Sequence, residues 1–388
     1  MIKPKQPKGG VMMSKNRNPL ALTRELLVYD TINPPGQERE CAQYLGKLLE
    51  EGGFQTEYYE YAEARTSLIA RLEGRSDKAP ICFTGHIDTV PLGAMAWSKD
   101  PFNGEQDGDK VYGRGSTDMK GGVATMVLAA LELARMPRGD AGIVLVLTAG
   151  EEIGCAGAAY LAQESNALGS AGAVVVGEPT ANYPLIGHKG VIWLEVRTKG
   201  VTAHGSMPEK GVNAIYKAAK VIHQLEQFQF HETFHPFLGK PTLNVGTIAG
   251  GLNVNSVPDQ TTICLDIRTI PGQESQQIVE QLQSQLGEEV EISRLFDLVS
   301  IASDPEEEWI QEIYDLTTPY LPEKPQPRGA TYATDACFLT PAYNDPPTVI
   351  LGPGEPDLAH KTDEFCHITK LEESMDIYLD IAKRWCHL

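Results

Sequence analysis

Acidic and imidazole side chains recur in this sequence at the ends of apolar segments. In chain order they are His86, Asp88, Asp118, Glu151, Glu152, Glu178 and His360. Taken singly, such residues are more often structural than functional, and an adjacent pair of glutamates is usually a solvated turn. Together, two imidazoles and several carboxylates form a donor set that suits Zn²⁺, with Co²⁺ or Mn²⁺ as alternatives. Two divalent ions sharing one bridging carboxylate would offset the repulsion between these anions and promote hydrolysis.

The segments that carry these residues are predicted to be buried strands followed by loops. Apolar runs occur in "APICFTGHIDTVP", "GIVLVLTAG" and "GAVVVGEPT". Helical patterns occupy residues 19–32, 37–52, 120–135, 305–320 and 370–386. This alternation predicts an α/β fold in which a mostly parallel sheet is covered by helices on both faces. Ligands of such sheets gather outside the carboxyl ends of the strands, which is where the acidic and imidazole side chains fall.

The pattern changes near residue 187 to strands that alternate between apolar and polar residues. The segment 187–296 is predicted to fold in the order β-α-β-β-α-β, a ferredoxin-like α+β arrangement of ordinary domain size. We therefore expect a catalytic metal-binding domain at 14–186 and 297–388, an inserted lid or dimerisation domain at 187–296, and a flexible tail at 1–13.

The composition is that of a globular protein with an acidic balance. Of 388 residues, 41% are hydrophobic, and the net charge is -19. Such a charge argues against a nucleic-acid partner. The seven cysteines form no C-x-x-C pair, which favours reduced thiols and a cytoplasmic location. The N-terminus lacks an apolar core, and no run of 18 apolar residues occurs, so neither a secretory signal nor a membrane partner is expected.

A family resemblance extends over roughly residues 20 to 385. The motifs that carry it are "GHIDTVP", "GRGSTDMKGG", "TAGEEIG", "VVGEPT" and "AHGSMPEKGVNAI". In this order they resemble the signatures of a dizinc metallohydrolase family. That family includes acetylornithine deacetylase, succinyl-diaminopimelate desuccinylase, aminoacylase-1 and glutamate carboxypeptidase. The resemblance implies a catalytic α/β domain with an inserted lid or dimerisation domain.

The same resemblance implies a role for each residue of the donor set. One ion would be bound by His86, Asp118 and Glu178, and the other by Asp118, Glu152 and His360. Asp118 would bridge the two ions and would be followed by a cis peptide bond. Asp88 would orient His86 and fix its tautomer. Glu151 would be the general base, so the neighbouring glutamates would have different functions.

The inserted domain offers further candidates. His204, in "TAHGSMP", is by itself most simply a turn residue, but the resemblance implies that it stabilises the oxyanion in the active site of a partner subunit. The resemblance also implies a substrate-binding asparagine in "GGLNVNSVPD", for which we favour Asn255 over Asn253. Arg268, at a predicted strand end, could bind a substrate carboxylate. The resemblance also implies a homodimer through this domain.

The predicted reaction is hydrolysis of the amide bond of an N-acyl amino acid. "GPGEPDLAHKTDEF" resembles the acetylornithine deacetylase branch, whereas "GATYATDACF" departs from the desuccinylase pattern. Dipeptidase or carboxypeptidase activity on short peptides is the alternative, and a non-catalytic metal-binding relative is a further one. Asp335 or Glu355 is a candidate rim acid for a cationic substrate side chain.

Overall fold

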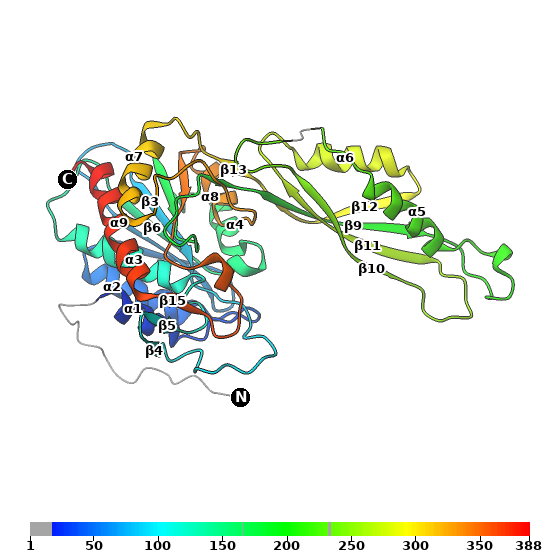
Figure 1. Ribbon diagram of the computed structural model, residues 1–388, viewed down its shortest axis with the longest axis horizontal. Helices are drawn as coiled ribbons and strands as arrows, with labels where there is room; N and C mark the ends of the chain where they lie inside the picture. The colour runs from blue at the N-terminus through cyan, green and yellow to red at the C-terminus, as the bar shows by residue number, and fades with distance from the viewer. Residues whose placement is uncertain (1–17, 165, 232–233) are drawn as a thin grey trace. The chain divides into compact units, whose positions relative to one another are not determined.

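The computed structural model describes residues 18–164, 166–231 and 234–388, and the chain divides into two compact units (Figure 1). One unit ends at Gly187 and resumes over Ser303–Arg328 and Thr334–Leu388, and the other comprises His188–Ala302 and Gly329–Ala333. The expected inserted domain ended at 296, but strand β12 (Val290–Leu298) continues beyond that point. The predicted tail at 1–13 lies outside the described residues.

The first unit is built on a six-stranded sheet with the order β1-β2-β6-β3-β7-β14. Its strands are β1 (Gln55–Ala62), β2 (Arg65–Leu72), β3 (Ile81–His86), β6 (Ile143–Thr148), β7 (Ala173–Val176) and β14 (Thr348–Ile350). Strands β6, β3, β7 and β14 are parallel, whereas β1 and β2 are antiparallel additions at one edge. The prediction of a mostly parallel sheet is confirmed.

Helices cover both faces of this sheet, as Figure 1 shows with α3 and α9 on one side and α4 and α8 on the other. The helices of this unit are α1 (Pro19–Leu27), α2 (Arg39–Glu51), α3 (Lys120–Ala134), α4 (Ala156–Gln163), α7 (Glu308–Thr317), α8 (Ala336–Ala342) and α9 (Ile368–Cys386). Helix α3 is buried around nearly its whole circumference because it packs against α1, α9 and β3. This explains why its sequence is rich in Ala, Leu and Val without a polar face.

The second unit has the element order β9-α5-β10-β11-α6-β12 and an antiparallel sheet with the order β10-β11-β9-β12. Its further elements are β9 (Gly190–Lys199), α5 (Ala214–Glu226), β10 (Thr242–Gly250), β11 (Gln260–Thr269) and α6 (Ser275–Leu286). Alternate residues of β9 and β11 are buried, because one face of the sheet packs against α5 and α6. The opposite face carries residues such as Trp193, which is 45% exposed.

Short elements complete the described chain. They are β4 (Gln106–Asp107), β5 (Lys110–Tyr112), β8 (Gly187–His188), β13 (Ile301–Ala302), β15 (Phe365–His367), η1 (Glu151–Ile153), η2 (Pro208–Lys210), η3 (Thr318–Tyr320) and η4 (Pro356–Leu358). All seven cysteines are free. Among the helices formed by the described residues, none combines the length and apolar character needed to cross a membrane.

Candidate metal centre

The carboxyl ends of three adjacent parallel strands meet at one edge of the first unit's sheet. His86 is the last residue of β3, and it pairs in register with Thr148, the last residue of β6. Glu151 and Glu152 follow Thr148 in η1. Glu178 follows β7, the neighbour of β3 on its other side. The predicted clustering at this sheet edge therefore results directly from the strand order.

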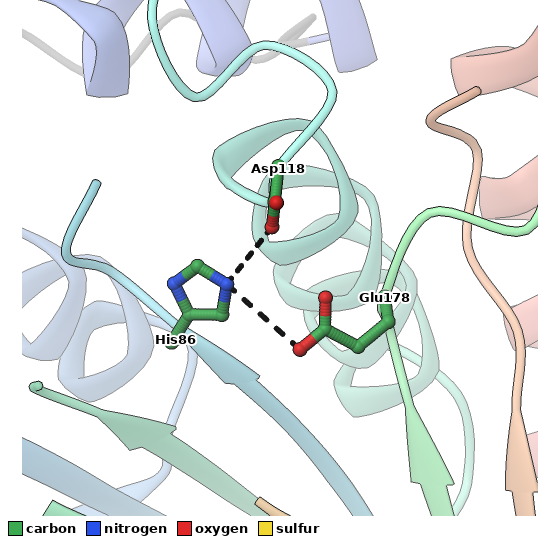
Figure 2. A group of neighbouring side chains, drawn as sticks. All are labelled: His86, Asp118 and Glu178. Atoms are coloured by element: carbon green, nitrogen blue, oxygen red, sulfur yellow. Dashed lines mark hydrogen bonds and ion pairs between the residues drawn. The ribbon is translucent and has the colours of Figure 1, made fainter. Parts of the chain in front are cut away.

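One group of potential ligands comprises His86, Asp118 and Glu178, whose donor atoms all lie within 4.8 Å of one another. Figure 2 shows the three side chains pointing toward a common space. His86 Nε2 lies 3.0 Å from Asp118 Oδ1 and 3.8 Å from Glu178 Oε1. Asp118 immediately precedes the helix-capping residue Met119, and the peptide bond between them is cis, as the resemblance implies. All three side chains are buried.

A second group shares Asp118 and adds Glu152 and His360. His360 Nε2 lies 3.3 Å from Asp118 Oδ2 and 3.1 Å from Glu152 Oε2. His360 follows η4 with a left-handed backbone, φ 64°, and its side chain is 55% exposed. The two carboxylate oxygens of Asp118 thus face different histidines, Oδ1 toward His86 and Oδ2 toward His360.

These separations fit a pair of divalent metal ions. Ligand atoms about 2.0–2.1 Å from a tetrahedral zinc ion lie roughly 3.4 Å apart. The histidine–carboxylate separations within the two groups range from 3.0 to 3.8 Å. The nitrogen and carboxylate oxygen donors are also those that zinc, cobalt and manganese accept. The described residues therefore fit the expected cofactor without rearrangement of the fold.

The charges in the cluster shift one another strongly in the absence of a cation. Burial raises the pKa of Glu178 well above its usual value, and the carboxylates of Asp118 and Glu152 add to this rise. Burial alone would lower the pKa of His86, but Glu178 and Asp118 raise it well above the ordinary value. Hydrogen bonds to Asp118 and Glu152 raise the pKa of His360 to about 10. A cation bound by these residues would favour deprotonated carboxylates and neutral imidazoles.

Asp88 connects the histidine to the paired glutamates. His86 Nδ1 donates to the main-chain carbonyl of Asp88 at 3.0 Å, whereas the Asp88 carboxylate lies 3.6 Å away. That carboxylate instead accepts the backbone N–H of Glu151 at 3.0 Å, the N–H of Glu152 at 3.3 Å and the Asn33 side-chain amide at 2.9 Å. The structure thus places the carboxylate as an anchor for η1, and the carbonyl as the partner that would fix the His86 tautomer.

Glu151 lies beside the potential ligands and the buried thiol of Cys155. One of its carboxylate oxygens is within 4.8 Å of the donor atoms of His86 and Glu152, and the Cys155 thiol lies 3.5 Å from Oε1. Burial and the charge of Glu178 raise the pKa of Glu151 well above its usual value. Asp335, expected as a rim acid, is instead only 1% exposed and accepts a hydrogen bond from Thr148. The interpretation of Asp335 as a rim acid is therefore wrong.

Two supporting residues were not identified from the sequence. Asn33, from "NPPG", donates to Asp88, and Glu364, from "KTDEF", accepts the backbone N–H groups of the loop that ends at Asp118. Both are buried. For Glu364 the available signal was its place in the same segment as the candidate ligand His360.

The remaining predicted site residues lie in the second unit. His204 and Asn255 belong to adjacent segments, because the N–H of Gly205 donates to the Asn255 carbonyl at 2.7 Å. The His204 Nδ1 lies 2.8 Å from Ser206 Oγ and 3.2 Å from the backbone nitrogen of Ser206. Arg268, near the end of β11, binds Asp266 through Nε at 2.7 Å and Nη2 at 3.0 Å. Its guanidinium is therefore already partly occupied by a carboxylate.

Comparisons with known proteins agree with the fold. The model of peptidase family M20/M25/M40 matches residues 82–384. A probable succinyl-diaminopimelate desuccinylase from Staphylococcus epidermidis is 31% identical over 384 residues, covering 90% of this chain and 93% of the relative. An acetylornithine deacetylase from Buchnera aphidicola is 31% identical over 324 residues, covering 80% of this chain and 82% of the relative.

Solved structures give a fold-level match. The M20 family metallo-carboxypeptidase Sso-CP2 from Sulfolobus solfataricus superposes with a TM-score of 0.80 at 18% identity, covering 96% of this chain and 100% of that protein. At that identity the likeness shows the fold alone. Curated relatives with deacetylase and desuccinylase names match at the same identity, so the resemblance to the deacetylase branch stays a prediction.

Proposed function

The chain belongs to peptidase family M20/M25/M40, a family of metal-dependent hydrolases, and on that premise we propose that it hydrolyses the amide bond of N-acyl amino acids. The substrate class follows from the curated relatives, whose names describe removal of an acetyl or succinyl group from an amino acid. The acetyl group is our first choice, because the segment around His360 resembles the deacetylase branch.

The observation that carries the proposal is the division of the Asp118 carboxylate between two histidines. Oδ1 lies 3.0 Å from His86 Nε2, and Oδ2 lies 3.3 Å from His360 Nε2. One carboxylate oriented in this way is suited to bridge two cations. His86 and Glu178 would complete one ligand set, and Glu152 and His360 the other. Zinc is the first choice of metal, with cobalt or manganese as alternatives.

The bound cations would polarise the substrate carbonyl and lower the pKa of a nearby water molecule. Glu151 is placed to accept the proton from that water and to return it to the leaving amine. Its carboxylate is near the ligand atoms of His86 and Glu152, yet neither proposed ligand set requires it. Asp88 holds the Glu151 backbone N–H and so sets the orientation of this base.

The second unit would complete the site in a homodimer. His204 would stabilise the oxyanion of a substrate bound by the partner subunit. Asn255 and Arg268 would bind the substrate, with Arg268 exchanging its contact with Asp266 for the substrate carboxylate. The dimer would form along edge strand β10, beside the exposed side chain of Leu252. We place this enzyme in the cytoplasm, in keeping with its free thiols.

The proposal is tested by measuring kcat/KM on N-acetyl-L-ornithine, N-succinyl-diaminopimelate and a dipeptide, with Zn²⁺ or Co²⁺ and after chelation. We expect the highest kcat/KM on an N-acyl amino acid and no turnover without metal. A preference for the dipeptide would replace the proposal with the peptidase alternative. Absence of turnover on every substrate with both metals would leave a non-catalytic metal-binding protein.

The base is tested with Glu151→Gln, which keeps the shape of the side chain but cannot accept the proton. We expect two bound zinc ions and a loss of kcat of about 100-fold or more. The matched control is Glu132→Gln, a change of the same kind on the outer surface of α3, where Glu132 pairs with Arg135. Turnover by Glu151→Gln equal to that of the control would remove Glu151 from the mechanism.

A further inference from the structure

A buried carboxylate that is not among the proposed ligands accepts a hydrogen bond from the backbone of Asp118. Glu364 has no exposed surface. It accepts the backbone N–H groups of Gly115 at 3.1 Å, Thr117 at 2.8 Å and Asp118 at 3.0 Å. Arg114 Nη1 donates to the same carboxylate at 2.5 Å. Every one of these donors belongs to the loop 114–118, which ends at the proposed bridging ligand.

The contacts of Glu364 tie together two segments that are distant in the sequence. Glu364 lies in the segment that also carries His360, whereas its donors lie in the loop that carries Asp118. Two more hydrogen bonds join the same segments: Thr117 Oγ1 donates to the Phe365 carbonyl at 2.6 Å, and the Gly113 N–H donates to the Glu364 carbonyl at 2.9 Å. The relative position of two proposed ligands of one cation therefore depends on this junction.

The loop directs several backbone donors toward one point, where they meet the Glu364 carboxyl group. Successive backbone N–H groups that converge on one place form a concave anion-binding site. Without the Glu364 carboxylate, these buried N–H groups would lack an acceptor, and the loop would have to rearrange to satisfy them. A rearrangement at the Asp118 backbone would move the carboxylate that faces both histidines. Metal–ligand distances vary by only a few tenths of an ångström, so a small displacement would weaken binding.

We propose that Glu364 is a positioning residue, which holds the Asp118 loop against the His360 segment so that both side chains reach the same cation. This inference rests on the proposed dinuclear site. It predicts unequal effects on the two ligand sets. The set of Asp118, Glu152 and His360 takes two ligands from the tied segments, whereas the set of His86, Asp118 and Glu178 takes only one.

A purely structural ion pair is the competing explanation, and the chain supplies a matched example of one. Glu38 is also fully buried and binds Arg65 Nε at 2.8 Å and Arg65 Nη2 at 2.8 Å. Its carboxylate pairs with this arginine side chain, and neither residue lies in the Asp118 loop or the His360 segment. Glu38→Ala therefore removes a buried carboxylate without touching the junction.

The experiment is a zinc titration of the full-length apo-protein against a competing chelator, for the wild type, Glu364→Ala and Glu38→Ala. Alanine is used because glutamine would keep a side-chain oxygen able to accept the N–H groups of Gly115, Thr117 and Asp118. In Glu364→Ala we expect one of the two binding events, the one at Asp118, Glu152 and His360, to lose at least tenfold in affinity and the other to change less. Turnover at limiting zinc should fall accordingly and recover toward the wild-type value in excess zinc. Glu38→Ala should lower the melting temperature but leave both affinities unchanged.

The zinc affinities distinguish a positioning role of Glu364 from a purely structural role. If both zinc affinities of Glu364→Ala equal those of the wild type, Glu364 is merely structural, whatever the melting temperature of the variant. Should this variant fail to fold, Glu364→Asp keeps the charge beside Arg114 but withdraws the carboxylate by one methylene, and unchanged affinities there would equally overturn the proposal. A wild-type protein that binds two zinc ions but hydrolyses no substrate would instead contradict the proposed function.

Discussion

The Asp88 carboxylate anchors the paired glutamates, and Asp88→Asn tests what that anchor contributes. The substitution keeps the size and the main-chain carbonyl, so the hydrogen bond from His86 Nδ1 at 3.0 Å is preserved. It replaces one carboxylate oxygen with an amide NH2 group, which can only donate. The amide would face either the N–H of Glu151 or the pair of donors from Glu152 and Asn33. The first arrangement loses fewer hydrogen bonds, so the bond to Glu151 should be the one lost.

The size of the expected loss of kcat follows from the kind of hydrogen bond that Asp88→Asn removes. A buried hydrogen bond to a charged acceptor contributes about 1.5–3 kcal/mol. If that energy holds the general base in its reactive position, its loss lowers kcat by a factor of about 10 to 150. The zinc content should stay at the wild-type value, because the main-chain carbonyl continues to orient His86.

Zinc content and single-turnover rates of Asp88→Asn, measured on the same N-acyl substrate, check this expectation. A variant that loses zinc while keeping the wild-type rate per fully loaded site would contradict it. In that case the carboxylate would act on His86, as the sequence resemblance implied, and its hydrogen bond to η1 would be incidental.

Two further predictions concern the second unit. Burial lowers the pKa of His188 from 6.5 to about 4, so the unfolded state binds more protons between these values and stability decreases as the pH falls. Between pH 7 and pH 5 this group should reduce the free energy of unfolding by about 2 kcal/mol, and His188→Gln should abolish that part of the pH dependence in urea titrations. The second prediction concerns Leu252, which is 99% exposed. Leu252→Asp should convert the proposed dimer into a monomer by light scattering, and an unchanged mass would place the interface elsewhere.

Long apolar segments made most of the fold predictable. Helix α3 and strands β3, β6 and β7 were expected because continuous burial leaves a clear apolar run. Strand β1 was not expected, since as an edge strand its residues are mostly exposed and polar. Helices α4 and α8 are short, and α8 contains Pro341, so neither gives a clear helical period. The helix expected at 19–32 ends at Leu27, because the chain then enters the loop that carries Asn33.

The candidate site was predictable where a side chain has few alternative uses. Histidines and acids at strand ends stand out, and the structure gathers those of the first unit. The anchoring contacts of Asp88 and Glu364 were not predictable, because they are made to backbone N–H groups, which every non-proline residue possesses. Which carboxylate accepts which N–H depends on loop geometry rather than on residue type.

The ligand cluster and its supporting carboxylates have complementary functions. Without cations, the acids of the cluster repel one another, and burial and mutual repulsion raise the pKa of Glu178 and Glu152. Glu364 accepts backbone N–H groups of the Asp118 loop, and Asp88 accepts those of Glu151 and Glu152. On our proposal these contacts set the spacing of the candidate ligands before any metal binds, so we expect zinc affinity to respond to changes at Glu364 and turnover to respond to changes at Asp88.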